Sequence, residues 1–179
     1  MNDTARDAII LYARSAIIAA LADRDAPPAP PYLAAEVPQH EGVFVTLYVR
    51  DELRGCMGNL DSTVPFITGL TRAATSAATV DSRFPRVRKE EFPFLHVEIN
   101  ILTDLHPLHD PDDIRIGAHG LIIEQGRHRG LLLPSVAVAQ ALDSGQFLEA
   151  VCRKAGLAAE AWKAPESRLS CFRTICFRS

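Results

Sequence analysis

The sequence predicts an α+β fold in which mostly antiparallel strands are flanked by helices. Residues 42–58 and 119–134 each contain two β-rich runs joined by a polar turn, which is typical of hairpins. Segments with helical periodicity lie between them. The chain has no repeated β-α-β rhythm, so antiparallel pairing is favoured, and a mixed sheet is the alternative.

The composition is that of an ordinary globular protein. The chain has 179 residues, of which 47% are hydrophobic and 23% charged, with a net charge of -3. We therefore expect a single domain over residues 1–179. A net negative charge provides no global attraction for nucleic acid, so we expect no such partner unless a local basic patch exists.

Cysteine usage and hydropathy predict the compartment. The four cysteines form no C-x-x-C pair, which indicates a reduced, cytoplasmic protein. Arg14 interrupts the apolar stretch 8–21, so we expect neither a membrane span nor a targeting segment. The sequence contains no phosphate-binding or dinucleotide-binding glycine motif, and we expect no cofactor.

The N-terminal segment is predicted to be an amphipathic helix. Its apolar residues recur with helical spacing from residue 5 to residue 20, and Thr4 and Asp7 have the spacing of a capping box. Four prolines within residues 27–31 then end the helix and predict an extended connector.

The next two elements are a hairpin and a helix. Residues 42–49 and 53–58 form two strands, and strict alternation places Arg54, Cys56 and Gly58 on one face. The helix that follows has Ser62 or Thr63 as its N-cap, an early proline and an alanine-rich face that allows close packing.

Residues 94–103 alternate between apolar and polar side chains and predict a strand. One face carries Val97, Ile99 and Ile101, and the other carries His96, Glu98 and Asn100. A strand face with three polar residues either meets water or lines a site.

The C-terminal part is predicted to hold a hairpin, two helices and a strand. Residues 126–130 form the hairpin turn, and a short helix begins at Ser135. The second helix is capped by Asp143 or Ser144 and closed by Gly156, and residues 168–177 form the last strand.

Cys56 lies between Gly55 and Gly58, two residues after Arg54. One interpretation is an activated thiol, because a nearby cation stabilises a thiolate and glycines let a ligand approach closely. The other is structural, because unpaired cysteine is often buried and glycine in a strand often marks tight packing.

Two further clusters have competing interpretations. Arg83 in the segment D-S-R-F-P is either an anion clamp oriented by Asp81 or one half of a structural ion pair. The histidines and aspartates of residues 106–119 suggest a metal site, but their spacing fits a turn and no zinc pattern, so we expect no metal. His119 is a candidate general base for Cys56.

These segments resemble the family named for the AMME-complex candidate region, which in prokaryotes includes protein A of the AmmeMemoRadiSam system. The similarity extends from Gly42 to Trp162 and includes the specific elements R-G-C-x-G and D-S-R-F-P. It implies a larger lobe built from both chain ends, packed against a smaller lobe with a cleft between them. It also implies a shared pathway with a Memo-family protein and a radical S-adenosylmethionine enzyme.

The resemblance also indicates which residues matter. Three positions depart from the family pattern: Asn100 replaces a usual serine, Ser135 a usual glutamine or glutamate, and Arg178 a usual acidic residue. The predicted site residues are Cys56, Glu98 and His119 for catalysis, and Arg54, Gly55, Gly58, Asp81, Arg83 and Asn100 for ligand binding.

Three functions compete. The first is an enzyme or enzyme subunit acting on a small anionic molecule or a nucleobase, with Cys56 as nucleophile or acceptor and Glu98 transferring protons. The second is a non-catalytic module that binds a ligand or partner through its arginines. The third, nucleic-acid binding through a local patch, predicts a steep loss of affinity with salt.

Overall fold

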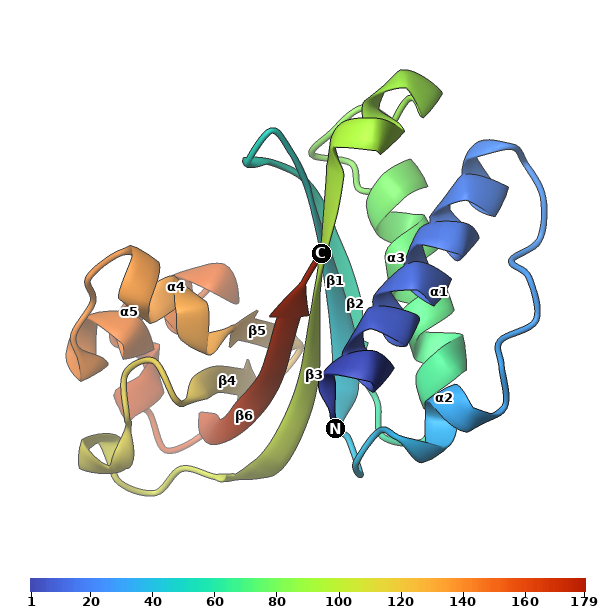
Figure 1. The fold of residues 1–179 in the computed structure, drawn as a ribbon. Helices are drawn as coiled ribbons and strands as arrows, with labels where there is room; N and C mark the ends of the chain where they lie inside the picture. The colour runs from blue at the N-terminus through green and yellow to red at the C-terminus, as the bar shows by residue number, and fades with distance from the viewer. The chain divides into compact units, whose positions relative to one another are not determined.

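The structure confirms the predicted α+β fold with antiparallel strands. The computed structural model describes residues 1–179 (Figure 1). The strands follow the hydrogen-bonded order β2-β1-β3-β6-β4-β5. Their bounds are β1 Gly42–Val49, β2 Glu52–Leu60, β3 Leu95–Pro107, β4 Gly120–Gln125, β5 His128–Leu132 and β6 Arg168–Arg178.

Five α-helices and three short 3-10 helices complete the fold. The α-helices are α1 Asp3–Leu21, α2 Tyr32–Ala35, α3 Phe66–Thr79, α4 Pro134–Ala139 and α5 Ser144–Lys154. The 3-10 helices are η1 Lys89–Phe94, η2 Pro111–Asp113 and η3 Ala161–Lys163. Helix α2 and the 3-10 helices are too short for periodicity to reveal in the sequence.

The chain divides into two compact units. Unit 1 comprises residues 1–102 and 175–179, and unit 2 comprises residues 103–174. The long strands β3 and β6 contribute residues to both. Each unit has its own apolar core. The cleft expected from the family resemblance stays a prediction.

In unit 1, helices α1 and α3 pack on one face of strands β1 to β3 (Figure 1). The alternation predicted for β3 is confirmed, because Val97, Ile99 and Ile101 are fully buried in this core. On the opposite face the register aligns the polar residues of β3 with alternate residues of β1.

The first hairpin is confirmed, and it contains a bulge that the sequence did not reveal. Arg50 and Asp51 form the turn with φ angles of 52° and 66°, the left-handed conformation that a tight hairpin turn requires. The register pairs Leu47 with Gly55 but Tyr48 with Leu53, which leaves Arg54 as an extra residue in β2. The strict alternation of side chains between the two sheet faces therefore holds from Gly55 to Leu60 and does not extend to Arg54, which was predicted to share a face with Cys56 and Gly58.

The predicted caps of the first two long helices are wrong. Asn2, not Thr4, caps α1, and its side chain accepts a hydrogen bond from the backbone N–H of Ala5. Helix α3 begins after Pro65 without a side-chain cap. Several polar residues precede each helix, and only the path of the incoming chain decides which of them meets the free N–H groups.

In unit 2, the β4–β5 hairpin is confirmed with a shorter turn than predicted. His128 already pairs with Gln125, so two residues make the turn instead of five. The cap of α5 is Asp143, which exchanges capping-box hydrogen bonds with Gln146. Gly156 follows the helix with a φ of 74°, as its predicted role requires.

None of the helices in residues 1–179 combines the length and apolar character needed to cross a membrane.

Candidate functional site

Three polar side chains form a row across the strands of unit 1. Thr46 of β1 is paired with Cys56 of β2 on one side and with Glu98 of β3 on the other, so all three lie on the same sheet face. The hydroxyl of Thr46 lies 3.4 Å from the sulfur of Cys56 and donates to it. Cys56 is only partly buried. The row therefore places a thiol, a hydroxyl and a carboxylate side by side across three neighbouring strands.

Asn100 and Tyr48 extend this polar face. The side-chain amide of Asn100, which is 2% exposed, donates to the carboxylate of Glu98 at 3.0 Å. Asn100 therefore orients Glu98. Burial, followed by the negative charge of Glu98, raises the pKa of Tyr48 and keeps its hydroxyl protonated.

The two glycines beside Cys56 have structural reasons. A Cβ at Gly55 would lie 2.1 Å from the backbone oxygen of Ala77 in α3, and a Cβ at Gly58 would lie 2.3 Å from the ring of Phe44. Gly55 thus permits the close approach of the alanine-rich helix face that the sequence predicted. Their assignment as ligand-binding residues stays a prediction.

Asp81 and Arg83 occupy the exposed hydrogen-bonding edge of β2 at Cys56. The backbone N–H of Cys56 donates to the Asp81 carboxylate at 2.9 Å, and Arg83 donates to the Cys56 carbonyl at 3.0 Å. Strand β2 is the first in the sheet order, so these groups have no neighbouring strand. The two side chains supply the bonds that a further strand would make, which protects the edge.

The ion pair of Asp81 with Arg83 is bidentate. The guanidinium of Arg83 donates to both carboxylate oxygens, at 2.9 and 2.7 Å. This pair holds the pKa of Asp81 well below its usual range and raises the pKa of Arg83, to which the sulfur of Cys56 contributes a smaller effect. The side chain of Asp81 is 4% exposed but that of Arg83 is 52% exposed. Arg83 therefore combines an edge-protecting role with access to solvent.

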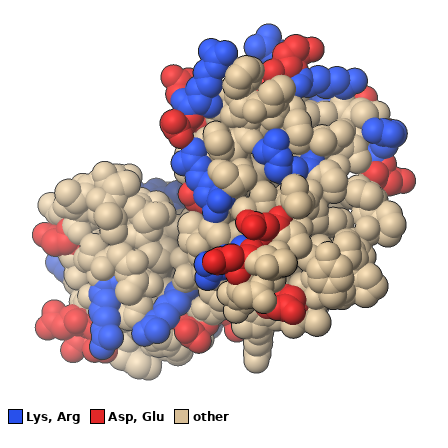
Figure 2. Space-filling model, in the orientation of Figure 1, with Lys and Arg blue, Asp and Glu red and all other residues tan.

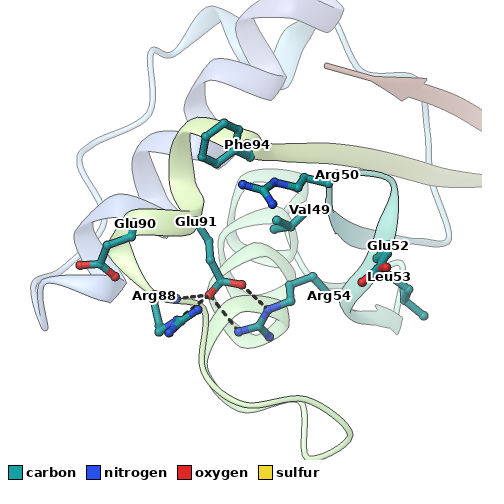
Figure 3. Close-up of a pocket in the computed structure, with 9 residues that line it drawn as sticks. All are labelled: Val49, Arg50, Glu52, Leu53, Arg54, Arg88, Glu90, Glu91 and Phe94. Atoms are coloured by element: carbon teal, nitrogen blue, oxygen red, sulfur yellow. Dashed lines mark hydrogen bonds and ion pairs between the residues drawn. The ribbon is translucent and has the colours of Figure 1, made fainter.

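The side chain of Arg54 is held by protein groups of the segment that follows Arg83 in the chain. Its guanidinium donates to Glu91 at 2.8 and 3.1 Å (Figure 3). It also donates to the backbone carbonyls of Pro85 and Arg86. The side chain is 14% exposed. The cation next to Cys56 is thus Arg83, and Arg54 fastens the loop that carries Arg83 to strand β2.

A hollow of about 590 Å³ adjoins the Arg54–Glu91 pair. Figure 3 shows the pair at its centre, with Arg50 and Phe94 on one side. Arg54 holds the pKa of Glu91 below its ordinary value, so Glu91 is a carboxylate at neutral pH. The lining residues are Val49, Arg50, Glu52, Leu53, Arg54, Arg88, Glu90, Glu91 and Phe94.

His119 lies in unit 2 and is 6% exposed. Its Nδ1 accepts a hydrogen bond from the backbone N–H of Arg115 at 3.4 Å. Burial, followed by the positive charge of Arg173, lowers the pKa of His119 and keeps the ring neutral. A neutral imidazole is the state a general base requires, but the pairing of His119 with Cys56 stays a prediction.

Sequence reasoning missed a cysteine–histidine contact in unit 2. The sulfur of Cys171 lies 3.1 Å from Nε2 of His106, whose Nδ1 donates to the carbonyl of Asp104 at 2.7 Å. Cys171 is 1% exposed, and burial raises its pKa. The contact joins residues 65 positions apart, and no local pattern indicates it.

The histidine- and aspartate-rich segment of unit 2 forms the predicted turn. Asp110 accepts a hydrogen bond from the backbone N–H of Asp112 and starts η2. No group of three or more His, Cys, Asp or Glu residues in the chain has a metal-binding arrangement. On the face shown in Figure 2, basic and acidic side chains are interspersed.

Comparisons with known proteins agree with the segments that carry the sequence resemblance. The model of the AMMECR1 family matches residues 10–177. A protein from Methanothermobacter thermautotrophicus is 45% identical over 145 residues, which cover 78% of this chain and 76% of its own. Protein MJ0810 from Methanocaldococcus jannaschii is 42% identical over 147 residues, covering 78% and 73% of the two chains.

A solved structure extends this similarity to the whole fold. The crystal structure of the uncharacterized protein PH0010 from Pyrococcus horikoshii superposes with a TM-score of 0.92 at 32% identity. The match covers 100% of this chain and 93% of that one.

Proposed function

Because the chain belongs to the AMMECR1 family, as the R-G-C-x-G and D-S-R-F-P elements predicted, we propose a function centred on the residue that both elements surround, Cys56. The protein is an enzyme, or an enzyme subunit, that uses this thiol on a small anionic molecule or a nucleobase. The pathway shared with a Memo-like protein and a radical S-adenosylmethionine enzyme, which the resemblance implies, is part of the same proposal.

The observation that carries the proposal is the row Cys56–Thr46–Glu98 with Arg83 beside it. The hydroxyl of Thr46 donates to the sulfur, and the Arg83 guanidinium is bonded to the carbonyl of the same cysteine. Reactive cysteines are found beside hydrogen-bond donors and cations, and Cys56 has one of each as a neighbour. Thr46, Asp81 and Arg83 each make contact with Cys56, whereas the surrounding glycines serve packing.

Each group has a role in this chemistry. The thiolate of Cys56 forms a sulfur–carbon bond with an electrophilic carbon of the substrate, and the half-exposed guanidinium of Arg83 binds the anionic group. Glu98, oriented by Asn100, is the proton acceptor on the same face; Thr46 separates it from the sulfur, so the proton of the thiol passes through solvent to Glu98 and from there to the leaving group.

Alkylation by iodoacetamide at neutral pH tests the proposal, with mass spectrometry locating the label. Cys56 is expected to react first. Cys176 is the internal control, because desolvation and the charge of Glu98 raise its pKa to about 11 although the residue is exposed. Labelling of Cys176 before Cys56, or a Cys56 inert in the folded protein, would reject the thiol chemistry.

The second candidate is a module that binds a ligand or partner without chemistry. It is favoured by the structural roles of Gly55, Gly58 and Arg54, which explain much of the R-G-C-x-G element without any reaction. Under this hypothesis Cys56→Ser retains function and Arg83→Gln loses it. Mass spectrometry of small molecules that copurify with the wild type and with each variant separates the two candidates.

A further inference from the structure

The outer edge of strand β2 is open beyond Cys56. The backbone N–H and C=O of Cys56 point away from β1, because they bond to the side chains of Asp81 and Arg83. The register with β1 stays continuous after Cys56, so the same groups of Gly58 and Leu60 also point outward. Strand β2 is the first in the sheet order, and no other part of the chain bonds to these groups. The N–H and C=O groups of both residues therefore face a free edge.

A groove lies beside this edge, between β2 and α3 (Figure 1). A Cβ at Gly55 would meet Ala77, and a Cβ at Gly69 would lie 3.5 Å from the side chain of Asn59, so α3 follows β2 along its length. The volume of the groove is about 160 Å³, below the range typical of small-molecule sites, and it therefore suits single side chains. The lining residues are Met57, Gly58, Asn59, Gly69, Arg72, Ala73 and Ser76.

A strand added to this edge would point alternate side chains toward α3. Gly58 lies on the sheet face of Cys56, and its neighbours Met57 and Asn59 lie on the face that α3 covers. Directly opposed residues of paired strands share a face, so the residues that oppose Met57 and Asn59 point toward α3. Gly58 is exposed and has no side chain to obstruct the approach of another backbone.

One positive charge lies in the groove without an acidic partner. Arg72 is exposed and is the only charged residue of the lining. None of the ion pairs in the chain includes it. A free guanidinium binds a carboxylate in bidentate fashion, and Met57 and Ala73 supply an apolar floor. The groove therefore matches an extended segment that carries a small apolar and an acidic side chain two positions apart.

We propose that the edge of β2 at Gly58 and Leu60 binds an extended acidic segment of a partner protein as an additional antiparallel strand. Main-chain hydrogen bonds to β2 supply affinity. The groove supplies specificity, because it takes the small apolar side chain while Arg72 binds the carboxylate. The added strand stops before Cys56, where side chains already close the edge. The inference does not depend on chemistry at Cys56, so the two proposals succeed or fail separately.

Fluorescence anisotropy of the full chain with a labelled peptide tests the inference. The probe is acetyl-T-V-T-E-T-V-T-E-amide, in which threonine occupies one face of the extended peptide and valine and glutamate alternate on the other. Saturable binding is expected, with a dissociation constant in the millimolar range or below. One control peptide has glutamine in place of glutamate. The other has N-methyl groups on the threonines, which oppose Gly58 and Leu60 and donate to β2. Each is expected to bind at least about tenfold more weakly.

Amide hydrogen exchange, measured by NMR, locates the added strand. Exchange of the Gly58 and Leu60 N–H groups is expected to slow at least about tenfold at saturating peptide, because both become hydrogen bonded. The amides of β5, the strand at the other end of the sheet order, should exchange at an unchanged rate. Equal slowing at β5 would show unspecific pairing of strand edges and reject the site.

Variants test the groove. Arg72→Gln is expected to weaken the peptide about tenfold, and Arg72→Lys, which keeps the charge, should weaken it less. Ser76→Met places a longer side chain in the groove with a residue that helices accept, and is expected to weaken the peptide about tenfold. Arg153→Gln, which alters an exposed arginine paired with Glu149 in unit 2, and Cys56→Ser should bind as the wild type does.

Four further results would overturn the inference. The first is no saturable binding of the probe by the wild type. The second is equal affinity for the probe and either control peptide. The third is wild-type affinity in both Arg72→Gln and Ser76→Met. The fourth is a dimeric chain in which the Gly58 amide is protected before peptide is added, which would assign the edge to a second copy. In each case the alkylation of Cys56 still tests the proposed function independently.

Discussion

The two units each place a cysteine beside polar partners, but they do so in different ways. In unit 1, Cys56 is partly buried, and its contacts are a hydroxyl, a carboxylate and a guanidinium. In unit 2, Cys171 is fully buried and bonded to an imidazole, His106. The histidine partner would usually suggest catalysis, yet Cys56 is the less buried of the two cysteines. Under the proposed function, access and charge, more than the presence of a histidine, distinguish the thiol of Cys56 from that of Cys171.

The largest expected effect comes from the packing that frames Cys56. Gly55→Ala would place a Cβ 2.1 Å from the carbonyl oxygen of Ala77, and neither backbone can move without separating α3 from the sheet. We expect a loss of about 3 kcal/mol in the free energy of unfolding, measured by urea denaturation. Gly145→Ala in α5 is the matched control, since its nearest contact is 3.4 Å away, and it should change stability by less than about 1 kcal/mol. Equal stability of the two variants would refute the packing argument.

The next effect concerns the ion pair at the edge of β2. Asp81→Asn leaves the Arg83 guanidinium and the Cys56 N–H with a weaker acceptor, and we expect a loss of about 2 kcal/mol at neutral pH. Asp3→Asn, which alters a 91% exposed aspartate paired with Arg6, should have almost no effect.

The ion pair also predicts how the stability difference between the wild type and Asp81→Asn depends on pH. Because the pKa of Asp81 is lowered in the folded state, its contribution is complete above about pH 5 and is lost as the pH falls from about 4 through the lowered value. The stability difference between wild type and Asp81→Asn should therefore shrink as the solution is acidified. Urea denaturation at several pH values measures it, and a difference that grows in acid would contradict the assignment.

Loss of the His106 side chain, which contacts the buried thiol of Cys171, is expected to reduce the stability less. His106→Ala removes the acceptor of the Cys171 thiol, which costs about 1 kcal/mol of stability. His109→Ala, at an exposed position on the same segment, is the control. Cys171 should stay unlabelled in both folded variants, and the alkylation of Cys56 should be unchanged. Rapid labelling of Cys171 in the folded wild type would remove the contrast between the two thiols.

The smallest expected effect is on the rate at which Cys56 is alkylated. Thr46→Val removes the hydroxyl that donates to the sulfur of Cys56, and we expect alkylation of Cys56 to slow about threefold. Thr46→Ser keeps the hydroxyl and should retain the wild-type rate. If the valine and serine variants react alike, the hydrogen bond has no part in activating the thiol.

Much of the site could be recognised from the sequence, but not the contacts within it. The alternation of β3 was sufficient to put Glu98 and Asn100 together on the polar face, because a half-buried strand has a period of two. Thr46 was missed, although a lone polar residue in the apolar run 42–49 was a usable signal. Glu91 carried no signal, because its bond to Arg54 joins residues 37 positions apart.

The sequence by itself determined the hairpins, the long helices, the polar strand face and the family, since these depend on local periodicity and on short specific segments. Only the tertiary structure decided what Arg54 and Asp81 do. A single extra residue in β2 ended the alternation at Arg54, and the unpaired edge of that strand met the Asp81–Arg83 loop. Both outcomes depend on which backbone groups of distant segments lack partners. Local patterns of residue types in the sequence do not reveal which groups those are.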